Sequence, residues 1–91
     1  MNRKRMYIWR LAALLAEYGM TMSGEELAAH LNRNNFLTEY GTPYAGNKRG
    51  TYKLINEVWK WLQNDLGLED EAKKVALSFV LPSGEYAWES N

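Results

Sequence analysis

RGTYKLINEVWKWLQNDL, residues 49–66, is the stretch of this chain with the clearest helical periodicity. At about 100° per residue, its large apolar side chains fall on one side of a helix and cover about half of the circumference. These side chains are Tyr52, Ile55, Val58, Trp59, Leu62 and Leu66, with Leu54 and Trp61 at the edge. Gly67 follows directly, and glycine commonly stands just past the end of a helix. The segment therefore predicts an amphipathic helix whose apolar side faces a core.

The opposite side of this helix carries a polar stripe. Its members follow one another at steps of four, three, four and three residues, which keeps them on one face. They are Arg49, Lys53, Asn56, Lys60 and Gln63. In DNA, Arg and Lys contact phosphates and guanine edges, and Asn and Gln pair with adenine. A solvated helix face has the same composition, so both interpretations of the stripe remain open.

Cations and small residues also precede and open the helix, in the order Asn47-Lys48-Arg49-Gly50-Thr51. Free backbone N–H groups at a helix start attract anions such as phosphate. An ordinary helix start that follows a glycine-containing turn has the same residues. The segment is therefore compatible with phosphate binding but does not require it.

Two shorter helices are predicted before this segment. Residues 4–18 are apolar around most of a helix circumference and are followed by Gly19. Ser23 and Glu26 have the spacing at which side chain and backbone cap each other, so a second helix is predicted from there to about residue 32. Residues 33–48 are rich in Asn, Gly and Thr, which predicts an unusually long connection to the third helix.

The end of the chain predicts a β-hairpin after a short acidic turn at residues 69–71. Apolar and other residues alternate at 75–79 and again at 85–89, which is the pattern of half-buried strands. Leu-Pro-Ser-Gly at 81–84 supplies the turn between them. Three helices followed by a hairpin predict a mainly α-helical chain with a winged helix-turn-helix fold, in which residues 1–91 form a single domain.

Composition limits the classes of protein to which the chain can belong. There is no cysteine, which excludes disulfides and thiolate metal sites and fits the cytoplasm. The most apolar stretch, residues 8–16, is too short to cross a bilayer, so no membrane association is expected. Net charge is zero, yet residues 1–64 hold nine Lys and Arg against five Asp and Glu. Residues 65–91 hold two against six, so a locally basic surface is compatible with the neutral total.

Catalytic and cofactor chemistry has little support in the sequence. His30 is the only histidine, and no acidic pair stands out from an ordinary helix surface, so we expect neither an enzyme nor a metal or cofactor site. The phases of the predicted elements place all four tryptophans in the core, namely Trp9, Trp59, Trp61 and Trp88. The basic run Arg3-Lys4-Arg5 either follows a DNA backbone or solubilises a frayed helix end.

A spaced pattern lies ahead of the third helix. It consists of Leu27-Ala28, Leu31-Asn32, Thr38 and Gly41-Thr42-Pro43-Tyr44. The pattern resembles helix-turn-helix segments of bacterial mobile elements, notably the region after the catalytic domain of serine recombinases. The resemblance covers about a third of the chain. It implies DNA binding without strand exchange, because the sequence contains no serine-nucleophile recombinase domain.

Together these patterns predict a bacterial transcriptional or mobile-element regulator that binds double-stranded DNA through the helix at 49–66. The residues expected to contact DNA are Asn47, Lys48, Arg49, Thr51, Lys53, Asn56 and Lys60. The predicted hairpin tip has no Lys or Arg and instead favours an alternative class, a protein-interaction module with a winged fold. That module would present Glu85, Tyr86, Trp88 and Glu89 to a partner protein.

Overall fold

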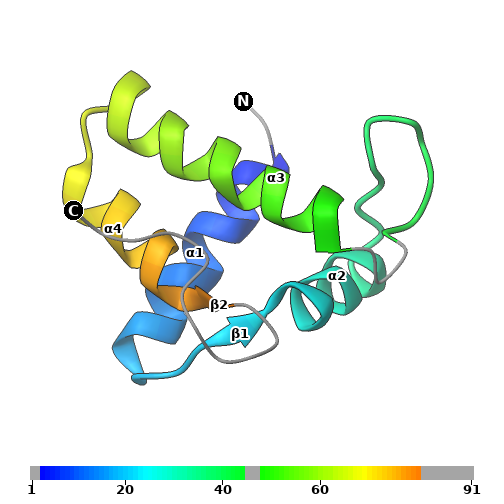
Figure 1. The fold of residues 1–91 in the computed structure, drawn as a ribbon, viewed down its shortest axis with the longest axis horizontal. Helices are drawn as coiled ribbons and strands as arrows, with labels where there is room; N and C mark the ends of the chain where they lie inside the picture. Colours follow the sequence, from blue (N-terminus) through cyan, green and yellow to red (C-terminus); the bar gives the residue numbers. More distant parts are fainter. Residues whose placement is uncertain (1–2, 45–47, 81–91) are drawn as a thin grey trace.

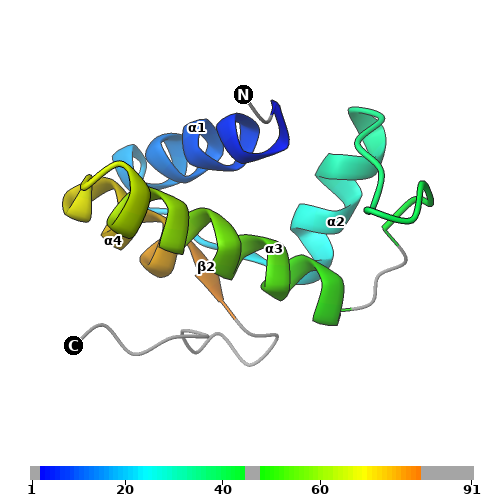
Figure 2. The ribbon, with the colours of Figure 1, turned by 90° about the horizontal axis from the view of Figure 1, so that it is seen from above.

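A computed structural model describes residues 3–44 and 48–80, and the protein is mainly helical, as the sequence predicts (Figure 1). The elements in chain order are α1 (Arg3–Glu17), β1 (Met22–Ser23), α2 (Gly24–Arg33), α3 (Lys48–Lys60), the π-helical segment η1 (Trp61–Asp65), α4 (Glu69–Ser78) and β2 (Phe79–Val80). α1, α3 and α4 pack together, and α2 stands at one end of this group beside the start of α3 (Figure 2).

The capping box predicted at the start of α2 is present. The Glu26 backbone N–H donates to Ser23 Oγ at 3.2 Å, and the Ser23 N–H donates to Glu26 Oε1 at 3.3 Å. These two bonds satisfy backbone donors that a helix start leaves without partners. At the other end, Asn34 donates from its backbone and from its side chain to the carbonyl of His30, which closes the helix.

α3 buries the apolar side that its periodicity predicts. Ile55 and Val58 of α3 and Leu62 of the following segment η1 are buried, and Tyr52 and Trp59 are half-buried. Leu66, which the periodicity places on the same side, is instead exposed, because it lies beyond the end of η1. The helix widens in η1, where the Leu66 N–H donates to the carbonyl of Trp61, five residues earlier, at 3.1 Å. Gly67 then adopts a φ of 66°, in the left-handed region that glycine tolerates best, and ends the helix as expected.

The expected hairpin is wrong in its first strand, because residues 69–78 form helix α4. The residues predicted as an acidic turn occupy its first turn, where the helix dipole favours negative charge. Ala72, Val75, Ala76 and Phe79 are spaced as one face of a helix and are all buried. That spacing outweighs the short alternation at 75–79, of which Leu77 is only half-buried. The expected second strand at 85–89 lies outside the described residues.

β2 follows α4 and pairs in parallel with β1, Met22 opposite Phe79 and Ser23 opposite Val80. Tyr52 of α3 joins this sheet to both neighbouring helices. Its hydroxyl donates to the Val80 carbonyl at 2.6 Å and accepts from the Gly24 N–H at 3.2 Å. The start of α2, the start of α3 and the sheet therefore meet at one phenol.

The core lies where α1, α3 and α4 converge. Its fully buried side chains come from all three helices and from β2, and include Ile8, Ala12, Ile55, Val58, Leu62, Ala72, Val75 and Phe79. Ser78 adds a polar link, because its buried hydroxyl is 3.1 Å from the Ala12 carbonyl of α1. α3 is thus anchored along one side, and its other side is left for solvent or a partner.

Gly24→Ala should destabilise the fold, because a Cβ at this position would lie 2.9 Å from the Tyr52 ring. The ring cannot move aside without disturbing its bond to Val80. We expect the free energy of unfolding to fall by about 1 to 3 kcal/mol, measured by chemical denaturation. Gly50→Ala is the control, since nothing lies within 4 Å of a Cβ there and alanine favours a helix. Equal stability of the two variants would contradict the close contact between Gly24 and Tyr52.

Candidate nucleic-acid interface

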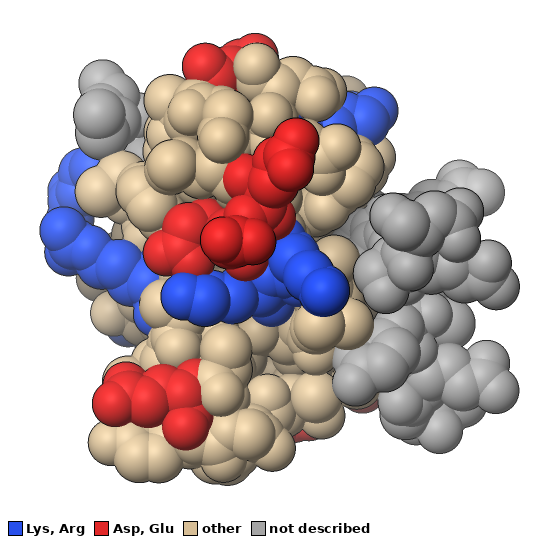
Figure 3. All heavy atoms as spheres, turned by 90° about the vertical axis from the view of Figure 1, so that its left-hand side faces the viewer, with Lys and Arg blue, Asp and Glu red and all other residues tan. Residues whose placement is uncertain are grey.

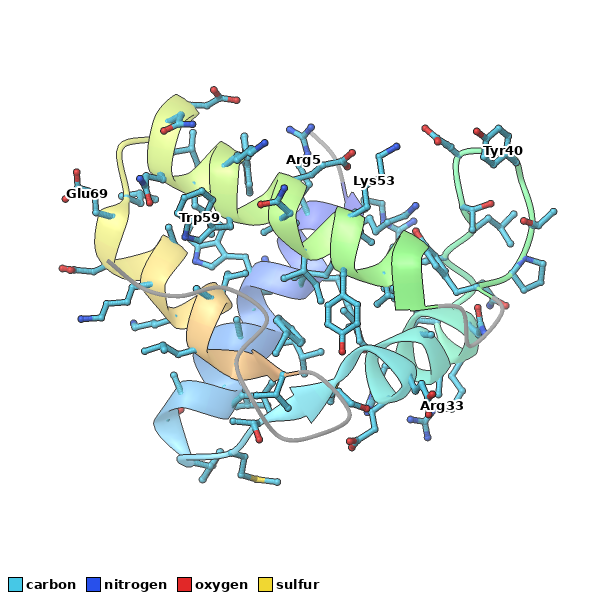
Figure 4. The ribbon with its side chains drawn as sticks, viewed as in Figure 1. Arg5, Arg33, Tyr40, Lys53, Trp59 and Glu69 are labelled. Carbon is cyan, nitrogen blue, oxygen red and sulfur yellow. The ribbon has the colours of Figure 1, made fainter. Side chains whose placement is uncertain are left out.

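The exposed side of α3 holds three of the residues predicted to contact DNA. Lys53 and Lys60 are exposed and Asn56 is half-buried. Lys53 points outward from α3 (Figure 4). Lys53 and Lys60 are two helical turns apart, about 10 Å along the axis, so they present charges on one face of a single rigid element.

Thr51 is a correction to the predicted set, because its side chain is fully buried. It precedes Ile55 by one turn and continues the row of Ile55, Val58 and Leu62 on the buried side of α3. Its hydroxyl has no hydrogen-bond partner among the described residues. A side chain in this position does not reach a duplex that lies on the opposite face.

The remaining predicted contacts lie at or before the start of α3. Asn47 falls outside the described residues. Lys48 and Arg49 form the first backbone turn of the helix. Their place in the chain keeps them at the end of α3 that adjoins α2.

Two carboxylates near the polar stripe were not part of the prediction. Glu57 is exposed and follows Lys53 by one turn, so the i to i+4 spacing of the sequence already contained this signal. Glu39 comes from the connection between α2 and α3, and its Oε1 lies 3.8 Å from Lys53 Nζ. Both side chains of this ion pair are about two-thirds exposed, so water screens most of its energy. In the part of this face that the structure describes, the exposed cations Lys53 and Lys60 therefore stand among carboxylates.

The connection between α2 and α3 is held by a hydrogen-bonded clamp that no sequence pattern indicated. The Asn32 side chain donates from Nδ2 to the Tyr44 carbonyl at 2.7 Å, and its Oδ1 accepts from the Tyr44 N–H at 2.7 Å. One amide thus closes the loop between residues twelve positions apart. An amide side chain is suited to this task because it offers a donor and an acceptor side by side.

Lys4 of α1 supports the same loop from its other side. Its Nζ donates to the Leu37 carbonyl and, at 2.7 Å, to the Tyr44 hydroxyl. The ammonium also lies 5.2 Å from the centre of the Tyr44 ring, in range of a cation–π interaction. A lysine predicted to meet DNA or to solubilise a helix end therefore fixes the loop to α1.

Arg5, the next residue of the basic run, lies over the ring of Trp61. Its guanidinium lies 5.6 Å from the Trp61 ring centre, and Trp61 meets Trp9 edge to face at 5.9 Å. Trp59 points from α3 toward α4 (Figure 4). These tryptophans are partly buried and pack against the core, less deeply than their phases predicted, whereas Trp88 lies outside the described residues.

The tip of the connection, residues 38–42, is a tight loop with its own hydrogen bonds. The Thr38 N–H donates to the Thr42 carbonyl at 2.8 Å, and the Gly41 N–H donates to the Thr38 carbonyl at 2.9 Å. Gly41 has a φ of 77°, which fits glycine in so tight a turn. The two threonine hydroxyls are 2.8 Å apart and bond to each other. Tyr40 lies at the tip.

This tip loop and α3 form the two walls of a shallow hollow of about 170 Å³. Thr38, Glu39 and Tyr40 line one wall, and Gly50, Lys53, Leu54 and Glu57 line the other. Lys4 and Tyr44 complete the lining. The polar stripe of α3 is therefore flanked by an ordered loop.

The face at the far end of the molecule has a different character. It carries a band of Lys and Arg side chains with Asp and Glu side chains on both sides (Figure 3). In α4, Lys74 Nζ lies 2.8 Å from Glu71 Oε2. This hydrogen bond holds the pKa of the Glu71 carboxyl below its ordinary value and raises the pKa of Lys74. The cations of α4 are thus accompanied by neighbouring carboxylates.

Comparisons with models of protein families, with curated proteins and with solved structures found no match to this chain. Within residues 3–44 and 48–80, no group of three or more His, Asp or Glu side chains is placed to hold a metal ion. None of the described helices has the length and apolar character needed to span a membrane.

Asn32→Ala should release the α2–α3 connection, because it removes both bonds to the Tyr44 backbone. We expect the amide of Tyr44 to exchange its hydrogen about five- to tenfold faster, with little change at amides of α3. Nuclear magnetic resonance measures this rate residue by residue. Asn64→Ala, at an exposed position in η1, is the control. An unchanged rate at Tyr44 in the Asn32 variant would show that the clamp does not hold the loop.

Proposed function

We propose that this chain is a DNA-binding protein of the winged helix-turn-helix class, which places α3 in the major groove of double-stranded DNA. The proposal includes a role as a transcriptional or mobile-element regulator in the bacterial cytoplasm. The observation that carries it is the exposed side of α3, where Lys53 and Lys60 stand on a helix anchored along its opposite side. The order α2, connection, α3 supports the helix-turn-helix assignment.

The dimensions of α3 support this proposal. The major groove of DNA is about 12 Å wide and admits one α-helix. α3 has 13 residues and therefore extends for about 20 Å, enough to cross the groove and its bordering phosphates. Asn56 lies between the two lysines on the polar stripe, so it is placed to meet a base edge while they meet phosphates.

A neutral chain depends on local charge for its attraction to DNA. Lys4 and Arg5 make contacts within the protein, whereas Lys53 and Lys60 are exposed cations of α3. Phosphate contacts by these two lysines would make the affinity for DNA fall as the salt concentration rises.

Replacing both lysines of the stripe, as Lys53→Gln with Lys60→Gln, should weaken binding to duplex DNA. Each lost phosphate contact removes released counterions, so the slope of log affinity against log salt should flatten by about 0.9 per contact. Fluorescence anisotropy with labelled random duplex at several salt concentrations measures both quantities. Lys73→Gln with Lys74→Gln in α4 removes the same charge and is the matched control. If the two double variants lose affinity equally, α3 is not the binding face.

Glu39→Gln should strengthen DNA binding by up to about fivefold at low salt. In the free protein Glu39 pairs with Lys53, so a phosphate must displace it before it contacts the lysine fully. Glu69→Gln removes the same charge at the first turn of α4, on the opposite side of the molecule (Figure 4). Screening over such a distance leaves this control nearly unchanged. An equal gain in both variants would indicate a general charge effect without a role for the pair.

Protein interaction is the second candidate, and one surface feature favours it. Leu14, Tyr18 and Met20 are all more than half exposed at the carboxyl end of α1 and just after it. Exposed apolar side chains that gather in one place are typical of protein contacts. The residues predicted for this role, from Glu85 to Glu89, lie outside the described part of the chain. Failure of the parent protein to bind any duplex at low salt would favour this candidate over DNA binding.

A further inference from the structure

Tyr40 stands at the tip of the loop beside the polar stripe of α3. Its side chain is 84% exposed, more than any other large apolar side chain among the described residues. A phenol in this state is available as a donor, and its ring offers a flat apolar face to a partner.

The backbone beneath Tyr40 is held by hydrogen bonds at its tip and at its base. Bonds between Thr38 and Thr42 close the tip, while Asn32 and Lys4 hold its base against α2 and α1. A loop that is already ordered loses little conformational freedom when it binds. The backbone of Tyr40 is therefore already in position, and only its side chain has to be ordered on binding.

The position of the tip loop beside α3 indicates which part of the DNA it would contact. Tyr40 and Lys53 line opposite walls of the same hollow, and Glu39 next to Tyr40 pairs with Lys53. Figure 4 shows both labelled side chains on the same edge of the molecule. When a helix occupies a major groove, the elements beside it meet the sugar–phosphate strands that border the groove. The loop stands in that flanking place relative to the stripe of α3.

We infer that the tip loop at residues 38–42 is a second DNA-contacting element, in which Tyr40 donates its hydroxyl to a backbone phosphate and packs its ring on the adjacent sugar. This inference rests on the proposed function. Tyrosine is among the side chains that commonly bind phosphate oxygens in DNA complexes. The contact carries no formal charge from the protein, so it does not depend on the ion pair between Glu39 and Lys53.

Tyr40→Ala tests this inference by fluorescence anisotropy with labelled random duplex at one low salt concentration. We expect affinity to fall about tenfold, the range for a hydrogen bond to a charged group together with lost packing. Tyr40→Phe removes the hydroxyl alone and should lose most of that factor. Tyr18→Ala is the matched control, because Tyr18 is also a highly exposed tyrosine but lies at the carboxyl end of α1, away from the loop (Figure 1).

The results of these measurements distinguish a failure of the Tyr40 contact from a failure of DNA binding itself. A parent protein that binds no duplex overturns the proposed function and the inference with it. A parent that binds, with a Tyr40→Ala variant of equal affinity, overturns the inference alone. An equal loss from Tyr18→Ala would also overturn it, because the effect would then not depend on the loop.

A double-variant cycle with Asn32→Ala gives a second readout. Asn32 bonds to the Tyr44 backbone and acts on DNA only by positioning the loop, so its removal should weaken binding by a smaller factor than Tyr40→Ala. In the double variant the two losses of affinity should not multiply, because displacing the loop has little further effect once Tyr40 is absent. Fully multiplicative losses would contradict the positioning role.

Discussion

The hydroxyl of Tyr52 is the contact on which the arrangement of the helices depends. It accepts from the backbone of Gly24 and donates to the backbone of Val80, so one side chain of α3 holds the start of α2 and the strand that follows α4. The Tyr52 ring can approach the backbone so closely only because Gly24 has no side chain. Because Ser23 pairs with Val80 in the sheet, the angle between α2 and α3 is fixed at the same place where the sheet forms. The direction in which α3 presents its polar stripe follows from this contact.

Sequence patterns predicted the parts of the fold that depend on local spacing. The capping box of Ser23 and Glu26, the apolar side of α3 and the end of the helix at Gly67 all involve residues within one or two turns of each other. Helix α4 was not predicted. Val75, Leu77 and Phe79 alternate as in a strand, and the same segment also has the spacing of a helix. Only the packing of this segment against α1 and α3 decides for the helix. A short apolar run supports both interpretations until its partners are known.

The candidate interface likewise combines residues that local spacing predicts with contacts that it does not predict. The exposure of Lys53 and Lys60 follows from the helical periodicity. The burial of Thr51 follows from it as well, because Thr51 lies one turn before Ile55 on the buried side. The ordered loop was beyond prediction, since its bonds join Asn32 and Lys4 to residues twelve to forty positions away. No local pattern records such partners. Residues 34–44 therefore have the polar composition of a loop, yet they are held in place by bonds to α1 and α2.

We propose that α3 and the tip loop at residues 38–42 together form the surface that binds DNA. Titration of isotope-labelled protein with duplex DNA, followed through its backbone amide resonances, tests this most directly. We expect the largest shifts at residues 50–60 and 38–42, with small changes along α4 and at the carboxyl end of α1. Shifts concentrated around Leu14, Tyr18 and Met20, or along α4, would contradict it.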